Sequence, residues 1–374
     1  MKKYLIHIIT ILLLVSCTGE KPVQEINSTS IEHASLLQME CVEEGLTICR
    51  IFNPWKQDET VAQYLLVSSN INGFGEKEIK ELNEKYGNSE IIRTPFEHIT
   101  LTASCHGYLL DQIDASRNIA VFCDADYVTY NGIRSLLDNN TIANGGNSMA
   151  PNIETILSKQ SDAIWISPFE NASAGNIESL PIPVIYCADY METSPLGRAE
   201  WMKFYGRLVD KAALADSLFN LVVNRYDSIK HVVLGVESQP DLSLSLMSEL
   251  PYQATWYVPG GRSTMGILYK DAGYEYPWAE DNHSGSLALS SEIVLSKAQN
   301  ADIWLFKYYA DHEYTLEELK SQNKFYGQFK AAKEGNVFGC NTSLTDYYDV
   351  VPFRPDILLE EIKNLGEGKY FKKL

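Results

Sequence analysis

Two glutamates stand at matching places in the two halves of this sequence. Glu154 begins the stretch 154–159 and Glu292 begins the stretch 292–297, and a short apolar run with a tryptophan follows each. Paired carboxyl groups can act as acid and base in glycoside hydrolysis, but only within roughly 5–9.5 Å of each other. Carboxylates placed one in each half are better suited to pair with two arginines of a two-fold symmetric partner. The helix dipole also favours a carboxylate in a first helical turn, whatever its function.

The stretches that carry these glutamates predict a duplicated structure. Each is preceded by a loop rich in glycine and serine, at 145–148 and 284–286, and each leads into an apolar run, at 163–166 and 302–305. Self-similarity of this kind indicates a repeated structural unit, although chance similarity of two helix-strand segments is the alternative. We therefore expect two related lobes.

Short apolar runs rich in β-branched residues alternate with amphipathic stretches along the chain. This alternation predicts an α/β fold with a mainly parallel sheet in each half. The expected strands are 64–67, 99–102, 119–122, 163–166 and 183–186 in the first half, and 231–236, 254–258, 302–306 and 336–338 in the second.

The longest helical pattern, residues 195–229, lies between the two halves. Ser194 is a good N-cap residue and Pro195 suits the first helical position. One continuous helix of this length would span about 50 Å and reach across both lobes. A break at Gly206 or within 210–213 is the alternative.

The N-terminus has the layout of a bacterial lipoprotein signal. A short basic start precedes an apolar run at 4–15, and the run ends at a small residue directly before Cys17. This pattern identifies Cys17 as the site of lipidation. The apolar run is shorter than the roughly 20 residues that a membrane-spanning helix needs. We expect residues 1–17 to be the signal with its lipidated cysteine, and the polar stretch 18–32 to be a flexible tether.

Length, charge and cysteine content limit the architecture further. The rest of the 374-residue chain exceeds what one hydrophobic core usually organises, so two lobes are expected, at 33–194 and 230–374, joined by the helix 195–229. The formal charge of −18, without a basic block, argues against nucleic acid or an anionic membrane surface as a partner. No Cys-x-x-Cys pair occurs, so a thiolate metal site is not expected, and the disulfide connectivity stays open.

The motifs of common exported enzymes are missing. The sequence lacks Gly-x-Ser-x-Gly, Gly-x-x-x-x-Gly-Lys and His-Glu-x-x-His, and its glycine pairs at 145–146 and 260–261 lack the spacing of dinucleotide-binding loops. We therefore expect no enzymatic activity, no catalytic residues, no cofactor and no resident metal.

Several short segments carry a family resemblance through their order and spacing. They are Arg93-Thr94-Pro95, residues 99–104, Cys123-Asp124-Ala125-Asp126-Tyr127, Asn152-Ile153-Glu154, the helix 195–229, Gly260-Gly261-Arg262, Leu289-Ser290-Ser291-Glu292 and Gly335-Asn336-Val337. From about residue 90 to the C-terminus, the chain resembles the periplasmic ABC-importer binding proteins for vitamin B12, ferric siderophores and haem. Residues 31–69 are an addition, which we expect to contribute a hairpin and a strand to the first lobe.

The resemblance implies a fold and a partner. The fold would be two Rossmann-like lobes joined by one long helix, and the partner would be an ABC permease dimer with its ATPase. In that family, glutamates at the tops of the lobes form ion pairs with permease arginines, and Glu154 and Glu292 occupy the matching positions. The protein would be an exported, monomeric lipoprotein that faces the periplasm and touches the membrane only through its anchor. A surface capture lipoprotein without a permease is the alternative.

The ligand is expected between the lobes, at the carboxyl ends of the strands. Loops there are rich in aromatic residues, which hold a flat corrin or porphyrin well, whereas an anionic siderophore usually calls for arginine and lysine. Arg262 and Lys307 are the obvious cations in these loops, so a corrinoid or haem is favoured over a ferric siderophore. The candidate ligand-binding residues are Ser104, His106, Tyr127, Phe169, Glu170, Tyr257, Arg262, Trp278, His283, Lys307, Tyr308 and Tyr347.

Two of these residues are potential metal ligands. His106 and His283 could approach each other across the cleft, and either could be an axial ligand to haem iron. The alternative is that both are ordinary polar loop residues. A protein that binds free zinc or manganese would need three histidines and a carboxylate at one point, and His98 lies too far back on its strand to serve easily.

Overall fold

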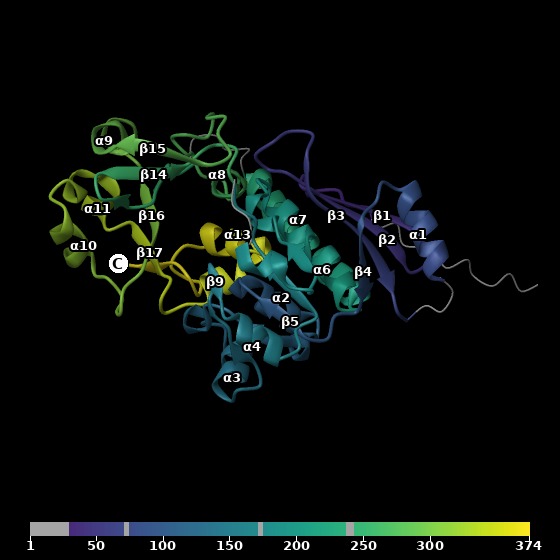
Figure 1. Cartoon of the computed structure of the whole chain (residues 1–374). Helices are drawn as coiled ribbons and strands as arrows, with labels where there is room; N and C mark the ends of the chain where they lie inside the picture. The colour runs from purple at the N-terminus through teal and green to yellow at the C-terminus, as the bar shows by residue number, and fades with distance from the viewer. Residues whose placement is uncertain (1–29, 71–74, 171–174, 237–242) are drawn as a thin grey trace, which may run out of the picture.

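The computed structural model describes residues 30–70, 75–170, 175–236 and 243–374 (Figure 1). Cys17 and most of the expected signal and tether therefore lie outside the described residues. The described chain is α/β, and most strands of its larger sheets are parallel. The expected fold class is confirmed.

The first sheet is built mainly from the residues that the family resemblance does not cover. Its strands, in spatial order, are β1 (Leu37–Glu43), β2 (Leu46–Phe52), β3 (Thr60–Ser68) and β4 (Glu90–Thr94), with α1 (Glu76–Lys85) between the last two. The first three strands are antiparallel, and β4 joins β3 in parallel. Gly45 turns the β1–β2 hairpin at φ 83°, a conformation that glycine adopts without steric penalty. The addition therefore contributes the expected hairpin and strand, and these form, together with β4, a sheet separate from the parallel core.

The second sheet is the parallel core of the first half. Its order is β11-β10-β5-β6-β7, and every neighbouring pair is parallel. The three central strands are short and fully buried, as expected for a sheet covered on both faces. The elements of this part of the chain are β5 (Ile99–Leu101), α2 (Ser104–Gln112), β6 (Ile119–Phe122), α3 (Asn131–Asp138), β7 (Ala143–Asn144), the separate hairpin β8 (Gly146–Asn147) and β9 (Ala150–Pro151), α4 (Ile153–Ser158), β10 (Ala163–Ile166) and β11 (Val184–Tyr186).

The second half contains a mixed sheet and a small antiparallel sheet. The mixed sheet has the order β12-β16-β17-β18, from β12 (Leu246–Ser248), β16 (Ile303–Tyr308), β17 (Val337–Asn341) and β18 (Lys372–Lys373). The small sheet consists of β13 (Pro251–Tyr252), β14 (Thr255–Pro259) and β15 (Ser286–Ser290). The helices are α8 (Thr264–Asp271), α9 (Ser291–Ala298), α10 (Leu316–Gln322), α11 (Lys330–Glu334), α12 (Tyr347–Val350) and α13 (Pro355–Lys363).

Three helices connect the halves where one was expected. They are α5 (Pro195–Glu200), α6 (Met202–Leu208) and α7 (Ala212–Val236), so the prediction of one continuous helix over 195–229 is wrong. The break before α7 includes Asp210 at φ 57°, which no helical residue adopts. Gly206 does not break α6. It allows α6 to approach α7, because a Cβ there would lie 2.4 Å from the Cβ of Ala215.

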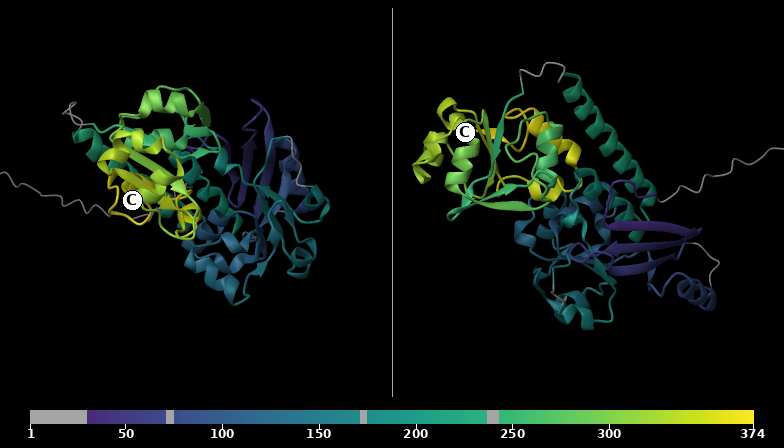
Figure 2. Two further views of the ribbon diagram at one scale, coloured as in Figure 1. Left: turned by 90° about the vertical axis from the view of Figure 1, so that its left-hand side faces the viewer. Right: turned by 90° about the horizontal axis from the view of Figure 1, so that it is seen from above.

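Helix α7 also overturns one expected strand. Residues 231–236 continue this helix, and the first strand of the second half is β12. The periodicity of a short apolar run does not show whether the run is the buried end of a helix or a strand. Figures 1 and 2 show α7 as the long helix between the first sheet and the second half.

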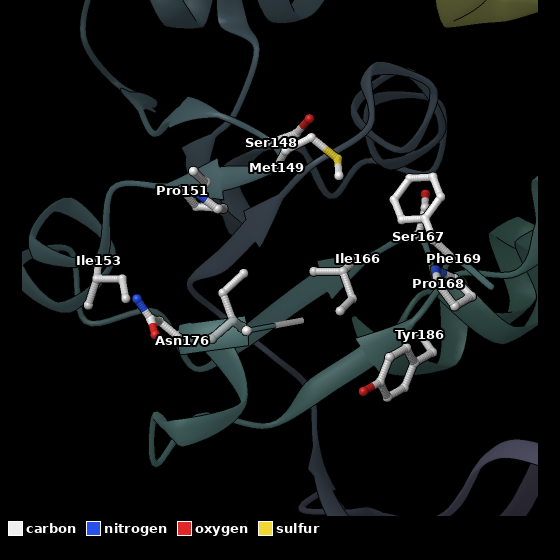
Figure 3. A pocket seen from close by; sticks show the side chains of 13 residues that line it. Ser148, Met149, Pro151, Ile153, Ile166, Ser167, Pro168, Phe169, Asn176 and Tyr186 are labelled. Carbon is white, nitrogen blue, oxygen red and sulfur yellow. The ribbon is translucent and has the colours of Figure 1, made fainter. Parts of the chain in front are cut away.

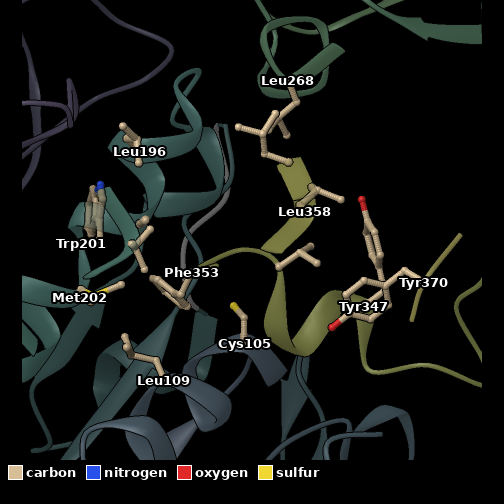
Figure 4. Packing of buried hydrophobic residues seen from close by; sticks show 14 of the residues in the cluster. Cys105, Leu109, Leu196, Trp201, Met202, Leu268, Tyr347, Phe353, Leu358 and Tyr370 are labelled. Carbon is tan, nitrogen blue, oxygen red and sulfur yellow. The ribbon is translucent and has the colours of Figure 1, made fainter. Parts of the chain in front are cut away.

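One hydrophobic cluster extends through both halves. Phe353, from the C-terminal part of the chain, is fully buried, and its ring centroid lies 5.9 Å from that of His106 and 6.0 Å from that of Tyr205. Figure 4 shows Phe353 between Met202, Leu109 and Cys105. A segment near the end of the second half therefore completes the core of the first.

Two buried glutamates hold the beginning of the described chain. The Glu200 carboxylate accepts hydrogen bonds from the backbone N–H groups of Glu32, His33 and Ala34 at 2.7–3.0 Å, and from Lys203 at 2.8 Å. Glu192 accepts hydrogen bonds in the same way from the N–H groups of Ser35 and Leu36 and from the Trp201 indole. The last residue of the expected tether is therefore already bound to the helices between the halves.

Replacement of Glu200 by glutamine should destabilise the fold in a pH-dependent way. Burial by itself would raise the Glu200 pKa, but hydrogen bonds from Lys203 and the N–H groups lower it below its ordinary value. A depressed folded-state pKa stabilises the fold above the unfolded pKa of about 4.3, and this contribution is lost as the pH falls through the folded pKa. We expect Glu200→Gln to lose about 2 kcal/mol at pH 7 in urea unfolding, and much less near pH 3. Glu78→Gln, at an exposed glutamate of α1, is the control, and a loss independent of pH would contradict this account.

Candidate functional site

A cavity of about 590 Å³ lies between the two halves. Its wall comes from five places: the 3₁₀ turn η4 (Asp189–Met191) with α5, the region from β14 to α8, residues 284–286, the ends of β12 and β16, and α12 with the start of α13. Thr264 of the second half also donates a hydrogen bond to the Glu192 carbonyl of the first, at 3.3 Å. We call this cavity the cleft.

Arg198 supplies a cation to the cleft wall. Its Nε donates to Asp189 Oδ2 at 3.1 Å, and its side chain is 25% exposed. Asp189 is buried and also accepts a hydrogen bond from the Tyr205 hydroxyl at 2.7 Å, while its Oδ1 lies 3.0 Å from His106 Nε2. Burial would raise the pKa of Asp189, but the charge and hydrogen bond of His106, then Arg198 and Tyr205, lower it. Asp189 is therefore an anion that fixes the Arg198 guanidinium at the cavity.

Lys307 is the second cation of the cleft. It forms an ion pair with Glu249, which also lines the cavity, at the ends of β16 and β12. Burial alone would lower the pKa of Lys307, but the neighbouring Glu249 carboxylate raises it above its ordinary value. Each cleft cation thus has one carboxylate partner, and the wall carries nearly balanced charge.

Aromatic side chains complete the wall. Tyr190, Tyr257, Tyr347 and Tyr348 line the cavity, and Tyr257 and Tyr348 are about half exposed. Rings of this kind provide flat apolar faces with a polar edge, which suits a conjugated or chelate ligand.

The structure brings only some of the predicted ligand-binding residues to the cleft. Tyr257, Lys307 and Tyr347 line it, and His106 lies behind Arg198 in the same buried network. The cavity wall does not include the others, which are Ser104, Tyr127, Phe169, Glu170, Arg262, Trp278, His283 and Tyr308.

Two of the misplaced residues belong to the core of the second half. Trp278 is 4% exposed and packs on Tyr276, and Tyr308 stacks on Tyr314 with ring centroids 4.3 Å apart. Arg262 and His283 are instead exposed, and although their neighbours Ser263 and Ser284 line the cleft, the two residues themselves are not part of its wall. An aromatic residue near the end of a strand can therefore pack in the core instead of lining the ligand site.

The two histidines do not approach each other across the cleft. His106 is 2% exposed and packs among Trp165, Tyr205 and Phe353, whereas the His283 side chain is 70% exposed and bonded to Asp281 at 2.8 Å. Because the His106 ring is buried, it cannot contact a ligand between the lobes.

One group among the described residues has the spacing of a metal site. The ligand atoms of Cys105, His106 and Asp189 lie within 4.8 Å of one another. His106 Nε2 lies against Asp189 Oδ1, and Arg198 and Tyr205 donate hydrogen bonds to the same carboxylate, so these groups already have partners within the protein. The donor set therefore does not suit a metal cation.

Arg198, Glu249, Tyr190 and Tyr348 are site residues that the sequence prediction did not include. Arg198 falls in the amphipathic pattern of 195–229, where an arginine is usually a solvent-facing helical residue. Its burial depends on contacts with Asp189 of η4, which the sequence pattern does not show. No motif distinguished Glu249 or Tyr190.

The two repeated stretches form the same local structure. Helix α4 has Asn152 as N-cap and leads to β10, and α9 has Ser290 as N-cap and leads to β16. Glu154 and Glu292 both lie in the first turn of their helix and are exposed. A backbone N–H hydrogen bond, assisted by the Ser290 hydroxyl, lowers the Glu292 pKa, so this carboxylate is charged at neutral pH.

A second cavity, of about 380 Å³, lies within the first half (Figure 3). It opens at the ends of β10 and β11, beside the β8–β9 hairpin, and its wall includes Met149, Ile166 and Phe169. We call it the side cavity. Phe169 is thus the one predicted ligand-binding residue found there.

Comparison with known proteins gives a consistent result. An uncharacterised lipoprotein of Methanocaldococcus jannaschii is 24% identical over 375 residues, which cover 95% of this chain and 86% of that protein. The periplasmic haem-binding protein of Vibrio cholerae superposes with a TM-score of 0.56 at 12% identity, over 73% of this chain and 100% of that one. A protein of an ABC-type Fe³⁺-hydroxamate transport system from Saccharomonospora viridis gives 0.54 at 15% identity, over 72% and 93%.

The family assignment comes from a match to the whole central part of the chain. The family model described as periplasmic binding protein matches residues 118–344, which include Arg198, Glu249 and Lys307. Proteins of this family bind substrates for transport and are not enzymes. Among the residues that the structure describes, no helix has the length and apolar character to cross a membrane. The chain therefore belongs to the periplasmic binding protein family.

Proposed function

We propose that this protein is the substrate-binding lipoprotein of an ABC importer and captures a metal chelate in the cleft. The observation that carries the proposal is the cavity between the halves, with Arg198 fixed in its wall by the buried Asp189 and Lys307 by the partly buried Glu249. A binding protein needs such a preformed, enclosed site with a few fixed polar groups. The family to which the chain belongs supports a permease as the partner.

The cleft favours a chelate with anionic groups at its edge. Arg198 uses Nε for Asp189, and its terminal nitrogens have no hydrogen-bond partner described in the structure. A guanidinium held in this way can bind a carboxylate or a hydroxamate oxygen. Arg198 takes the place that the sequence prediction assigned to Arg262 beside Lys307, and its guanidinium is only partly exposed. A fixed guanidinium in the wall supports haem or a ferric siderophore relative to a corrinoid.

The proposed partner is a permease dimer with its ATPase, which would bind Glu154 and Glu292. The two glutamates are exposed, they stand at equivalent positions of a repeated helix-strand unit, and Glu292 is charged at neutral pH. We propose that the protein acts as a monomer, with lipid attached at Cys17 and the binding domain facing the periplasm.

Chelate binding tests the proposed function directly. Purified protein is titrated with haemin, ferrioxamine B and cyanocobalamin, and tryptophan fluorescence and visible absorption are followed. We expect at least one chelate to bind, and Arg198→Lys to weaken it about tenfold or more, because lysine lacks the bidentate fork of arginine. Arg117→Lys is the matched control, since Arg117 is exposed, lies in the 3₁₀ turn at Ser116–Asn118 and is outside the cleft wall. If none of the three chelates binds, a different ligand class is required.

Charge reversal tests the proposed partner. The variant Glu154→Lys with Glu292→Lys should retain chelate affinity but lose most transport, or most stimulation of the permease ATPase in proteoliposomes, because lysine repels the permease arginines. Glu317→Lys is the control, since Glu317 is an exposed glutamate in the first turn of α10. Normal transport in the double variant would exclude the docking role and leave a surface capture lipoprotein as the function.

A further inference from the structure

The side cavity differs from the cleft in its chemistry. Met149, Ile153, Ile166, Phe169, Ile177 and Tyr186 are the large side chains of its wall, which otherwise consists of small or uncharged residues such as Ser148, Ser167 and Asn176. No side chain that is charged at neutral pH belongs to this wall among the described residues, whereas the cleft contains Arg198, Glu249 and Lys307. A cavity of this composition favours an uncharged apolar group, because a charge placed there would find no partner.

The floor of the side cavity is a buried hydrophobic cluster. Ile166 and Ile177 belong to a buried cluster with Ile156 and Ile164, at the ends of the parallel strands β10 and β11. Above this base, Met149 is 71% exposed and Phe169 is 47% exposed. Figure 3 shows these two side chains at one rim of the cavity, with Ile166 below them. Large apolar side chains gathered at the mouth of a cavity are typical of a binding site.

Tyr190 makes the two cavities neighbours. This residue lines the cleft, and its hydroxyl donates a hydrogen bond to the Pro168 carbonyl. Its ring centroid lies 6.3 Å from that of Phe169. Both Pro168 and Phe169 line the side cavity, so one tyrosine stands between an apolar space and a space with fixed cations.

We propose that the side cavity is an apolar subsite of the cleft, which takes an uncharged apolar arm of the same ligand. This inference rests on the proposed function of the cleft. The ligand is then a chelate of two parts: an anionic part beside Arg198 and Lys307, and an aromatic or acyl part over Met149 and Phe169. Tyr190 separates the two parts and contacts both.

Two fluorescent probes that differ by one charged group test this inference. N-phenyl-1-naphthylamine is neutral, and 8-anilino-1-naphthalenesulfonate adds a sulfonate to the same ring system. We expect the neutral probe to bind with saturation. Met149→Asp should lower its affinity about tenfold or more, because the substitution places a charge in the apolar wall. Arg198→Lys should leave the neutral probe unaffected. Each of the two substitutions should lower the affinity for the sulfonate probe, because this probe would occupy both cavities.

Control variants separate the side cavity from other exposed apolar residues. Phe169→Ala is a second substitution in the wall, at an exposed side chain that the fold does not need for burial. Leu157→Asp changes an exposed leucine of α4 that is outside the wall, and it should leave both probes unaffected. Circular dichroism and the unfolding midpoint confirm that each variant is folded.

The outcomes also distinguish this inference from the proposed function. Neutral-probe binding that is absent, or that Met149→Asp leaves unchanged, overturns the inference even if chelates bind in the cleft. Sulfonate binding that responds to only one of the two substitutions shows two separate sites and overturns it as well. If both probes behave as expected but no chelate binds, the bipartite site stands and the chelate proposal fails.

Discussion

The buried carboxylate of Asp189 is the constraint on which the site depends. A charge removed from water must be paired and hydrogen-bonded, and Asp189 meets this need through His106, Tyr205 and Arg198. Three different elements therefore converge on one side chain: α2, α6 and α5. Because Arg198 is the partner nearest the surface, the same pairing that stabilises the anion also fixes a cation at the cleft wall. The position of the ligand site follows from the electrostatics of the core.

The segment between the halves extends this arrangement to the whole molecule. Glu192 and Glu200 hold the backbone of residues 32–36, and Phe353 brings the C-terminal segment into the core of the first half. Asp349, which is also buried, accepts hydrogen bonds from the N–H groups of Thr129 and Tyr130 at 3.0 and 2.8 Å. The halves are therefore joined by buried polar contacts as well as by the helices α5 to α7. A cleft bounded in this way is a largely preformed site, which lowers the entropic cost of binding.

The sequence predicted most of the strands of the parallel sheets, because buried parallel strands are short, continuous apolar runs with β-branched residues. The sequence was a weaker guide where the same residue pattern suits both a helix and a strand. The run 231–236 is apolar in either a helix or a strand, and the break at Asp210 depends on a backbone conformation that aspartate adopts only occasionally. Trp278 and Tyr308 were plausible ligand contacts by residue type and position. The structure buries them because the second half needs their rings to fill its core.

The sequence by itself determined the α/β class, the repeated unit that carries Glu154 and Glu292, and the family resemblance, since these depend on local pattern and on order along the chain. Only the tertiary structure decided which residues form the cleft. Arg198, Glu249 and Tyr190 come from the helices and strand ends that meet there, and Asp189 turns an inconspicuous helical arginine into a fixed cation. Contacts between residues far apart in the chain leave no local signal, because burial and charge pairing depend on the partner and not on the neighbours in sequence.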